Sequence, residues 1–283
     1  MGHPVPAREL HDRRRHHGRA LAQIQQRIAD ACARAGRPPE SVTLLPVSKT
    51  FGIDAIREAM ALGLTRFGEN KTQEIRQKAA ALAGEGLQWV LIGHLQTNKA
   101  RDAARDATEV QSLDRVELAE ALHRRLVNEG RSLDVLVQVK TSSEPSKYGM
   151  APGDVPAFLR RIAADFPTLH VRGLMTLAVN SPDPDEVRAC FRALRELRDR
   201  LRQDNLPGVS LDRLSMGMSG DFELAIEEGS TEVRIGTAVF GARATPIRSR
   251  PSRGVDRKRA LFFGPFCISA RHNGGARKKA TRT

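Results

Sequence analysis

Cysteine is scarce in this chain of 283 residues. The three cysteines, Cys32, Cys190 and Cys267, are odd in number, lie far apart and lack the short spacing of metal-binding pairs. This pattern excludes the disulfide framework of a small secreted domain and gives no sign of a bound metal. A reducing compartment is the simplest setting for such a chain.

Long apolar runs are missing as well. A bilayer span needs roughly 20 apolar residues, and the longest run in the C-terminal region, residues 260–270, is interrupted by Gly264 and Pro265. The N-terminus carries arginine and histidine where an export signal would need an apolar stretch. We therefore expect a cytoplasmic protein without a membrane partner.

Acidic residues are rare only at the two ends of the chain. The formal net charge is +13, yet residues 244–283 hold eleven Lys or Arg and one acid, and residues 1–19 hold five Arg and two acids. The stretch between them, 20–243, therefore has no net charge. Both ends lack the periodicity of a folded element, so we expect disorder in a basic, His-rich extension (1–19) and in a basic tail (244–283).

Short apolar runs alternate with amphipathic segments between these ends. A helical pattern over residues 20–35 comes first. The apolar runs that follow are at 42–47, 66–68, 89–92, 110–113, 133–139, 169–175, 211–215 and 233–235. Helices are predicted between them, near 53–62, 70–83, 97–106, 115–128, 154–164, 184–203 and 219–228. Eight such repeats predict one α/β domain over 20–243, a (β/α)₈ TIM barrel with an extra N-terminal helix. An open doubly wound sheet is the alternative.

A lysine stands at the end of the first predicted strand. Lys49 follows the apolar run in the sequence VSKT, and strand ends form the functional face of a parallel barrel. Burial favours the neutral amine, which attacks aldehydes. The alternative is an ordinary surface lysine whose stem lies along the strand end.

Two glycine-containing loops follow the seventh and eighth predicted strands. Ser219 lies in the first loop, whereas Gly236 and Thr237 lie in the second. Free backbone N–H groups at such a place can bind a phosphate, although ordinary turns have the same composition. Arg234 ends the last strand and must face an acceptor, because an arginine does not lose its charge.

Three further loops concentrate amides and lysines at the same face of the predicted barrel. They lie at residues 67–71, 93–99 and 146–149. We interpret His94 in the second loop as a structural hydrogen-bonding residue rather than a catalyst. Glu69 is open to two interpretations, a charge at a helix start or a carboxylate of the site.

Seven ordered blocks of this sequence together resemble the YggS/PROSC family of proteins that bind pyridoxal 5′-phosphate (PLP) and maintain its homeostasis. The resemblance covers about residues 20–243. The blocks are 47–50 (VSKT), 67–70 (FGEN), 93–99 (GHLQTNK), 146–149 (SKYG), 173–175 (GLM), 214–219 (LSMGMS) and 233–241 (VRIGTAVFG).

The resemblance implies a fold similar to the N-terminal barrel of bacterial alanine racemases and a PLP site within it. Lys49 would hold PLP covalently as a Schiff base, and Arg234 would face the pyridine nitrogen. The phosphate contacts would be Ser219, Gly236 and Thr237. Two further residues, Asn70 and Met175, would lie near the ring. No metal ligand and no catalytic residue is implied.

The family is considered to buffer or deliver PLP, with no established reaction of its own. The racemases use a tyrosine from a second, β-rich domain for which this chain has no room, and Tyr148 is its one tyrosine. We therefore expect a monomeric PLP carrier, not an enzyme, with PLP-dependent apo-enzymes as partners. The alternative is a PLP-dependent amino-acid racemase or lyase. Nucleic acid would bind only nonspecifically, through the basic tail.

Overall fold

The computed structural model describes residues 7–240, so the basic tail predicted at 244–283 lies outside the described residues. Within this range eight strands alternate with helices. The strands are β1 (Thr43–Pro46), β2 (Arg66–Glu69), β3 (Gln88–Leu91), β4 (Glu109–Leu113), β5 (Leu133–Gln138), β6 (Leu169–Met175), β7 (Val209–Met218) and β8 (Glu232–Ile235). The helices are α1 (Ala7–Arg34), α2 (Ile53–Met60), α3 (Thr72–Ala81), α4 (Ala100–Asp106), α5 (Val116–Glu129), α6 (Val155–Asp165), α7 (Pro184–Leu201), α8 (Phe222–Glu227) and α9 (Thr237–Phe240).

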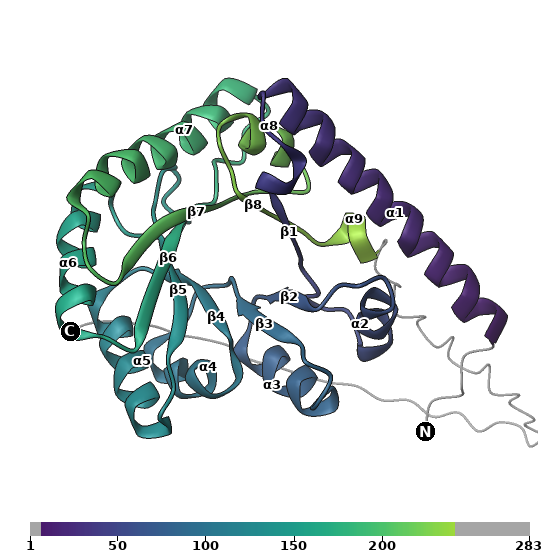
Figure 1. Cartoon of the computed structure of the whole chain (residues 1–283), viewed down its shortest axis with the longest axis horizontal. Helices are drawn as coiled ribbons and strands as arrows, with labels where there is room; N and C mark the ends of the chain where they lie inside the picture. Colours follow the sequence, from purple (N-terminus) through teal and green to yellow (C-terminus); the bar gives the residue numbers. More distant parts are fainter. Residues whose placement is uncertain (1–6, 241–283) are drawn as a thin grey trace, which may run out of the picture. The chain divides into compact units, whose positions relative to one another are not determined.

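The strands form one parallel sheet that closes on itself. Neighbours follow the order β1-β8-β7-β6-β5-β4-β3-β2. A parallel bridge from Val47 to Gly68 joins the two ends of this order, and the Ser48 N–H donates to the Gly68 carbonyl at 3.0 Å. Helices lie outside the strands (Figure 1). The predicted (β/α)₈ barrel is confirmed, and the open doubly wound sheet was the wrong alternative.

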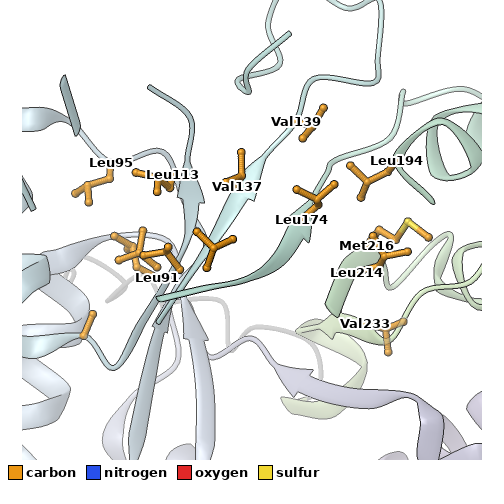
Figure 2. Close-up of a cluster of buried hydrophobic side chains, with 14 of the residues drawn as sticks. Leu91, Leu95, Leu113, Val137, Val139, Leu174, Leu194, Leu214, Met216 and Val233 are labelled. Atoms are coloured by element: carbon orange, nitrogen blue, oxygen red, sulfur yellow. The ribbon is translucent and has the colours of Figure 1, made fainter. Parts of the chain in front are cut away.

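Helix α7 illustrates how the sequence builds the outer layer. Asp183 caps its start, with a side-chain oxygen that accepts from the Asp185 N–H at 2.9 Å, and Pro184 occupies the first turn. Apolar residues recur at helical spacing along its buried face: Val187, Cys190, Phe191, Leu194, Leu197 and Leu201. Figure 2 shows Leu194 beside the outward-facing side chains of Leu174, Leu214 and Met216 from β6 and β7. The main apolar core therefore lies between the strands and the helices.

The interior of the barrel is polar at the amino ends of its strands. Four charged side chains meet there: Arg66, Glu109, Arg213 and Glu232, here called the amino-end quartet. Arg66 binds Glu109 at 2.9 Å and Glu232 at 2.6 Å. Arg213 binds the same two carboxylates at 2.8 and 2.6 Å. Burial alone would raise the pKa of Glu232, but the two guanidinium groups outweigh it and hold that pKa at about 2.

Two boundaries differ from the sequence prediction. Helix α1 begins at Ala7, earlier than the helical pattern predicted over residues 20–35. That prediction depended on apolar periodicity, which residues 7–19 lack, whereas arginine, leucine and alanine are good helix formers by themselves. Strand β7 continues to Met218 through a segment predicted as a loop. Gly217 permits this for two reasons. Its φ of +98° is one that residues with a side chain rarely adopt, and a Cβ there would lie 2.6 Å from the Cβ of Ala225.

Asp154 occupies the N-cap of α6 and Asp221 that of α8, and neither side chain makes a capping bond. None of the helices described for residues 7–240 is long and apolar enough to cross a bilayer.

Candidate functional site

A cavity of about 350 Å³ opens at the carboxyl ends of the strands, the face where parallel barrels place their sites. We call it the carboxyl-end cavity. Five of the seven predicted site residues line it: Lys49, Asn70, Ser219, Arg234 and Gly236. The remaining lining residues are Val47, Ile92, Gly93, His94, Gln138, Tyr148, Leu177 and Met218. A cavity of similar size over residues 201–212 contains none of the predicted residues.

The other two predicted residues are Met175 and Thr237, and each neighbours a lining residue, in strand register or in sequence. Met175 ends β6 and is fully buried, paired in register with Gln138 and Ser215. Thr237 begins α9 directly after Gly236. Its placement in the phosphate contact therefore stays a prediction.

Lys49 enters the cavity from the end of β1. The strand carries it because Val47 still pairs with its neighbours, with its N–H donating to the Ile235 carbonyl at 2.9 Å. Lys49 is half-buried, whereas the adjacent Ser48 is fully buried. Lys49 is the one lysine among the cavity's lining residues in the described part of the chain.

Arg234 reaches the cavity from β8, inside the barrel. Its Nη1 donates to Ser215 Oγ at 2.8 Å and its Nη2 to the Thr176 carbonyl at 2.9 Å. The side chain is 3% exposed, and burial lowers its pKa to about 10 against the opposing effect of Glu232 and Asp221. Arg234 therefore stays protonated at neutral pH and can only donate hydrogen bonds.

The loop after β7 is held by Asp221. Its Oδ1 accepts from the Met218 N–H at 2.6 Å, and burial raises the pKa of this carboxyl group against the effect of that N–H and of Arg234. The loop presents Ser219 exposed at the cavity, and the space around the Cα of Gly220 is open. In the loop after β8, Gly236 approaches β1 so closely that a Cβ would lie 3.1 Å from the Val47 carbonyl oxygen. Short side chains thus leave backbone groups accessible on this side of the cavity.

Two features of the cavity wall escaped the sequence analysis. Gln138 ends β5, and its Nε2 donates to the Tyr148 carbonyl at 3.1 Å while its Oε1 is buried with no partner among the described residues. Tyr148 stacks on His94, with ring centroids 3.9 Å apart and an interplanar angle of 15°. A polar residue at the end of the apolar run 133–139 was the available signal for Gln138, whereas the stacking joins two loops that lie far apart in the sequence.

The charges of the cavity favour an anionic ligand. Lys49 and Arg234 contribute cationic groups, and no carboxylate is among the lining residues that the structure describes. Asn70 and Ser219 add neutral donors, and a volume of about 350 Å³ fits a small molecule. The arrangement can thus bind a compact anion and hold an amine against it.

Comparison with protein families places residues 20–244 in the family described as alanine racemase, N-terminal domain. Among similar curated proteins, a pyridoxal phosphate homeostasis protein of Pseudomonas aeruginosa is 46% identical over 224 residues, which cover 79% of this chain and 94% of that protein. One of Aquifex aeolicus is 43% identical over 223 residues, covering 79% and 96%.

Solved structures agree with this grouping. The PLP-bound structure of PipY from Synechococcus elongatus has a TM-score of 0.67 at 40% identity and covers 77% of this chain and all of that one. A structure described as an unknown protein from Bifidobacterium adolescentis has a TM-score of 0.76 at 34% identity and covers 84% of this chain and 98% of that one. D-threonine aldolase from Filomicrobium marinum shares the fold alone, with a TM-score of 0.60 at 19% identity.

Proposed function

Because the chain belongs to the family of pyridoxal phosphate homeostasis proteins, we propose that it binds PLP in the carboxyl-end cavity and serves intracellular PLP homeostasis by buffering or delivering the cofactor. The single observation that carries the proposal for the site is the meeting of Lys49 and Arg234 in one cavity without a carboxylate. When bound, PLP supplies an aldehyde that condenses with amines and a ring that withdraws electrons.

The donor set of the cavity fits each part of this cofactor. Ser219 and the backbone of Gly236 would bind the phosphate, together with Thr237 on sequence grounds. Asn70 would contact the ring. Met175, which is buried at the end of β6, would lie near the same ring. The unpartnered Oε1 of Gln138 offers one buried acceptor for a donor on a ligand.

Arg234 supports storage rather than turnover. A protonated guanidinium beside the pyridine nitrogen can only donate to it, so the nitrogen keeps its lone pair and gains no proton. The ring then withdraws electrons weakly. We propose that the chain has no amino-acid turnover of its own, with L-alanine racemisation staying at background, and no structural observation favours the racemase or lyase alternative.

We propose that PLP attaches covalently to Lys49. Lys49→Ala should purify folded but without the imine absorbance near roughly 420 nm that borohydride abolishes, because the cavity then lacks an amine. Lys71→Ala is the matched control, since Lys71 is an exposed lysine of a neighbouring loop outside the cavity. A borohydride-reducible cofactor in Lys49→Ala at wild-type stoichiometry would refute the assignment.

The setting of this function follows from the sequence. We propose a monomeric protein in the cytoplasm that exchanges PLP with PLP-dependent apo-enzymes, in line with its three scattered cysteines and the neutral stretch 20–243. Any binding of nucleic acid would depend on the basic tail and weaken steeply with salt.

A further inference from the structure

The segment that carries Lys49 is anchored from beneath by a cluster of polar and charged side chains. The cluster consists of Ser48, Glu69, Glu74 and Lys78, and we call it the Lys78 cluster. Lys78 Nζ lies 2.8 Å from the Ser48 carbonyl oxygen, 2.5 Å from Glu69 Oε1 and 3.4 Å from Glu74 Oε2. Ser48 Oγ donates to the same Glu69 oxygen at 2.5 Å. The residue before Lys49 is therefore bound through both its backbone and its side chain.

The residue after Lys49 is bound to the same cluster. The Thr50 N–H donates to Glu74 Oε2 at 2.8 Å. Thr50 has a φ of +68°, a left-handed conformation that β-branched residues avoid. Such strain persists where surrounding contacts impose it, and it collects at functional sites. Lys49 is thus the residue between two anchors, one of them strained.

The buried polar and charged side chains of the Lys78 cluster are a costly way to stabilise the fold. Lys78 is 5% exposed and Glu69 is fully buried. Buried ion pairs recover their desolvation cost only when every polar atom is satisfied, yet Glu69 Oε2 has no partner among the described residues. Burial raises the pKa of Glu69 to about 6 although Lys78 and Ser48 oppose it. An apolar contact between α3 and β1 would hold the fold at lower cost.

From these contacts we infer that Lys78 is a positioning residue for Lys49, acting through the Ser48 carbonyl and, with Glu74, through the Thr50 N–H. The inference rests on the proposed function of the cavity. Lys78 would serve the covalent attachment of PLP. In that step Lys49 releases its ammonium proton to solvent, and the neutral amine bonds to the aldehyde carbon of PLP. A C=N bond forms and one water molecule leaves. Orientation of the amine governs the rate of such a step, because misplacement by about 1 Å costs up to roughly a hundredfold.

The test compares covalent attachment with total binding of PLP in the full-length chain. Lys78→Met removes the anchor, and Lys78→Arg retains a buried cation that can reach the same oxygens. Ile75→Ala is the matched control, because Ile75 is an apolar residue of the same helix, 1% exposed, and its truncation should destabilise α3 while removing none of the hydrogen bonds given above for the cluster. Equilibrium dialysis gives total binding, and growth of the borohydride-reducible absorbance gives the rate of attachment.

We expect Lys78→Met to attach PLP at least about tenfold more slowly, with a much smaller change in total binding. Lys78→Arg should recover most of the rate, and Ile75→Ala should keep it. If Lys78→Met does not fold, Glu74→Gln replaces it. This substitution at a half-buried position weakens the Thr50 anchor and the 3.4 Å contact with Lys78 but leaves the bond from Lys78 to the Ser48 carbonyl, so it should give a smaller drop. An unchanged rate in the folded variant, or an equal loss in Ile75→Ala, would overturn the positioning role.

A second measurement separates this inference from the proposed function. Brief acetylation with acetic anhydride followed by peptide mass spectrometry reports the reactivity of Lys49 relative to Lys71 without any PLP. A wild-type chain that binds no PLP refutes the proposed function. A ratio of Lys49 to Lys71 labelling that is the same in wild type and Lys78→Met overturns the positioning role, whatever the cofactor does.

Discussion

The two ends of the barrel treat buried charge in opposite ways. At the amino ends of the strands, two arginines and two glutamates of the amino-end quartet each bind both opposite partners, at 2.6 to 2.9 Å. At the carboxyl ends, Arg234 contacts only neutral oxygens, and Glu69 and Gln138 each keep a buried oxygen unpartnered among the described residues.

The pKa directions express the same contrast. Glu232 of the quartet has its pKa lowered to about 2, because two guanidinium groups outweigh its burial. Glu69 has its pKa raised to about 6, because burial outweighs Lys78 and Ser48. Charges that satisfy one another hold the fold together, whereas incompletely satisfied groups retain the capacity to bind a ligand. The amino end is thus suited to stability, and the carboxyl end is suited to the ligand binding that we propose.

Breaking the quartet should give the largest effect on stability. Glu109→Leu leaves Arg66 and Arg213 with one carboxylate between them, and loss of one partner from a buried ion network costs about 3–5 kcal/mol. Urea unfolding would measure the loss. The control is Glu223→Ala, whose partner Arg27 is about half exposed, so the cost should stay below about 1 kcal/mol. Equal losses in the two variants would show that the quartet is no more structural than a surface pair.

The two glutamates should give opposite pH dependences of unfolding. The lowered pKa of Glu232 means that its contribution, on the order of 3 kcal/mol, is present above pH about 4.5 and is lost as the pH falls toward 2. The raised pKa of Glu69 means that its contribution is present below pH about 4.5 and is lost as the pH rises through about 6. Urea unfolding of wild type, Glu232→Gln and Glu69→Gln across this range would measure both. Parallel wild-type and variant curves would contradict the contrast.

The smallest effect should come from the loss of a single hydroxyl. Two serines near opposite ends of β7 test it. Ser219→Ala at the carboxyl end should weaken PLP by about 1.5–3 kcal/mol, or roughly tenfold to a hundredfold, because a donor to a charged phosphate is lost. Pyridoxal, which has no phosphate, should bind almost as before. Ser210→Ala, where the hydroxyl donates to Asp212 near the amino end, should leave both affinities unchanged. Equal weakening of PLP and pyridoxal in Ser219→Ala would exclude the phosphate contact.

Much of this arrangement could be predicted from local patterns. The alternation of apolar runs and helices predicted all eight strands. Each β/α repeat buries its own apolar face, and the pattern of that face is visible in a short window of sequence. Lys49 and Arg234 could be placed at strand ends for the same reason. The start of α1 was set too late, since residues 7–19 show no apolar period although the helix runs through them.

The sequence by itself determined the barrel and put Lys49 and Arg234 at its carboxyl end, since strand ends of a parallel barrel converge on one face wherever the strands lie in the chain. Only the tertiary structure decided which polar side chains pair inside. Glu109 and Glu232 are 123 positions apart, yet closure of the barrel brings both to Arg66. The left-handed Thr50 and the anchoring of Ser48 by Lys78 likewise depend on contacts between β1, β2 and α3. Ion pairing and strain are properties of distances across the fold, and no local pattern of residues encodes those distances.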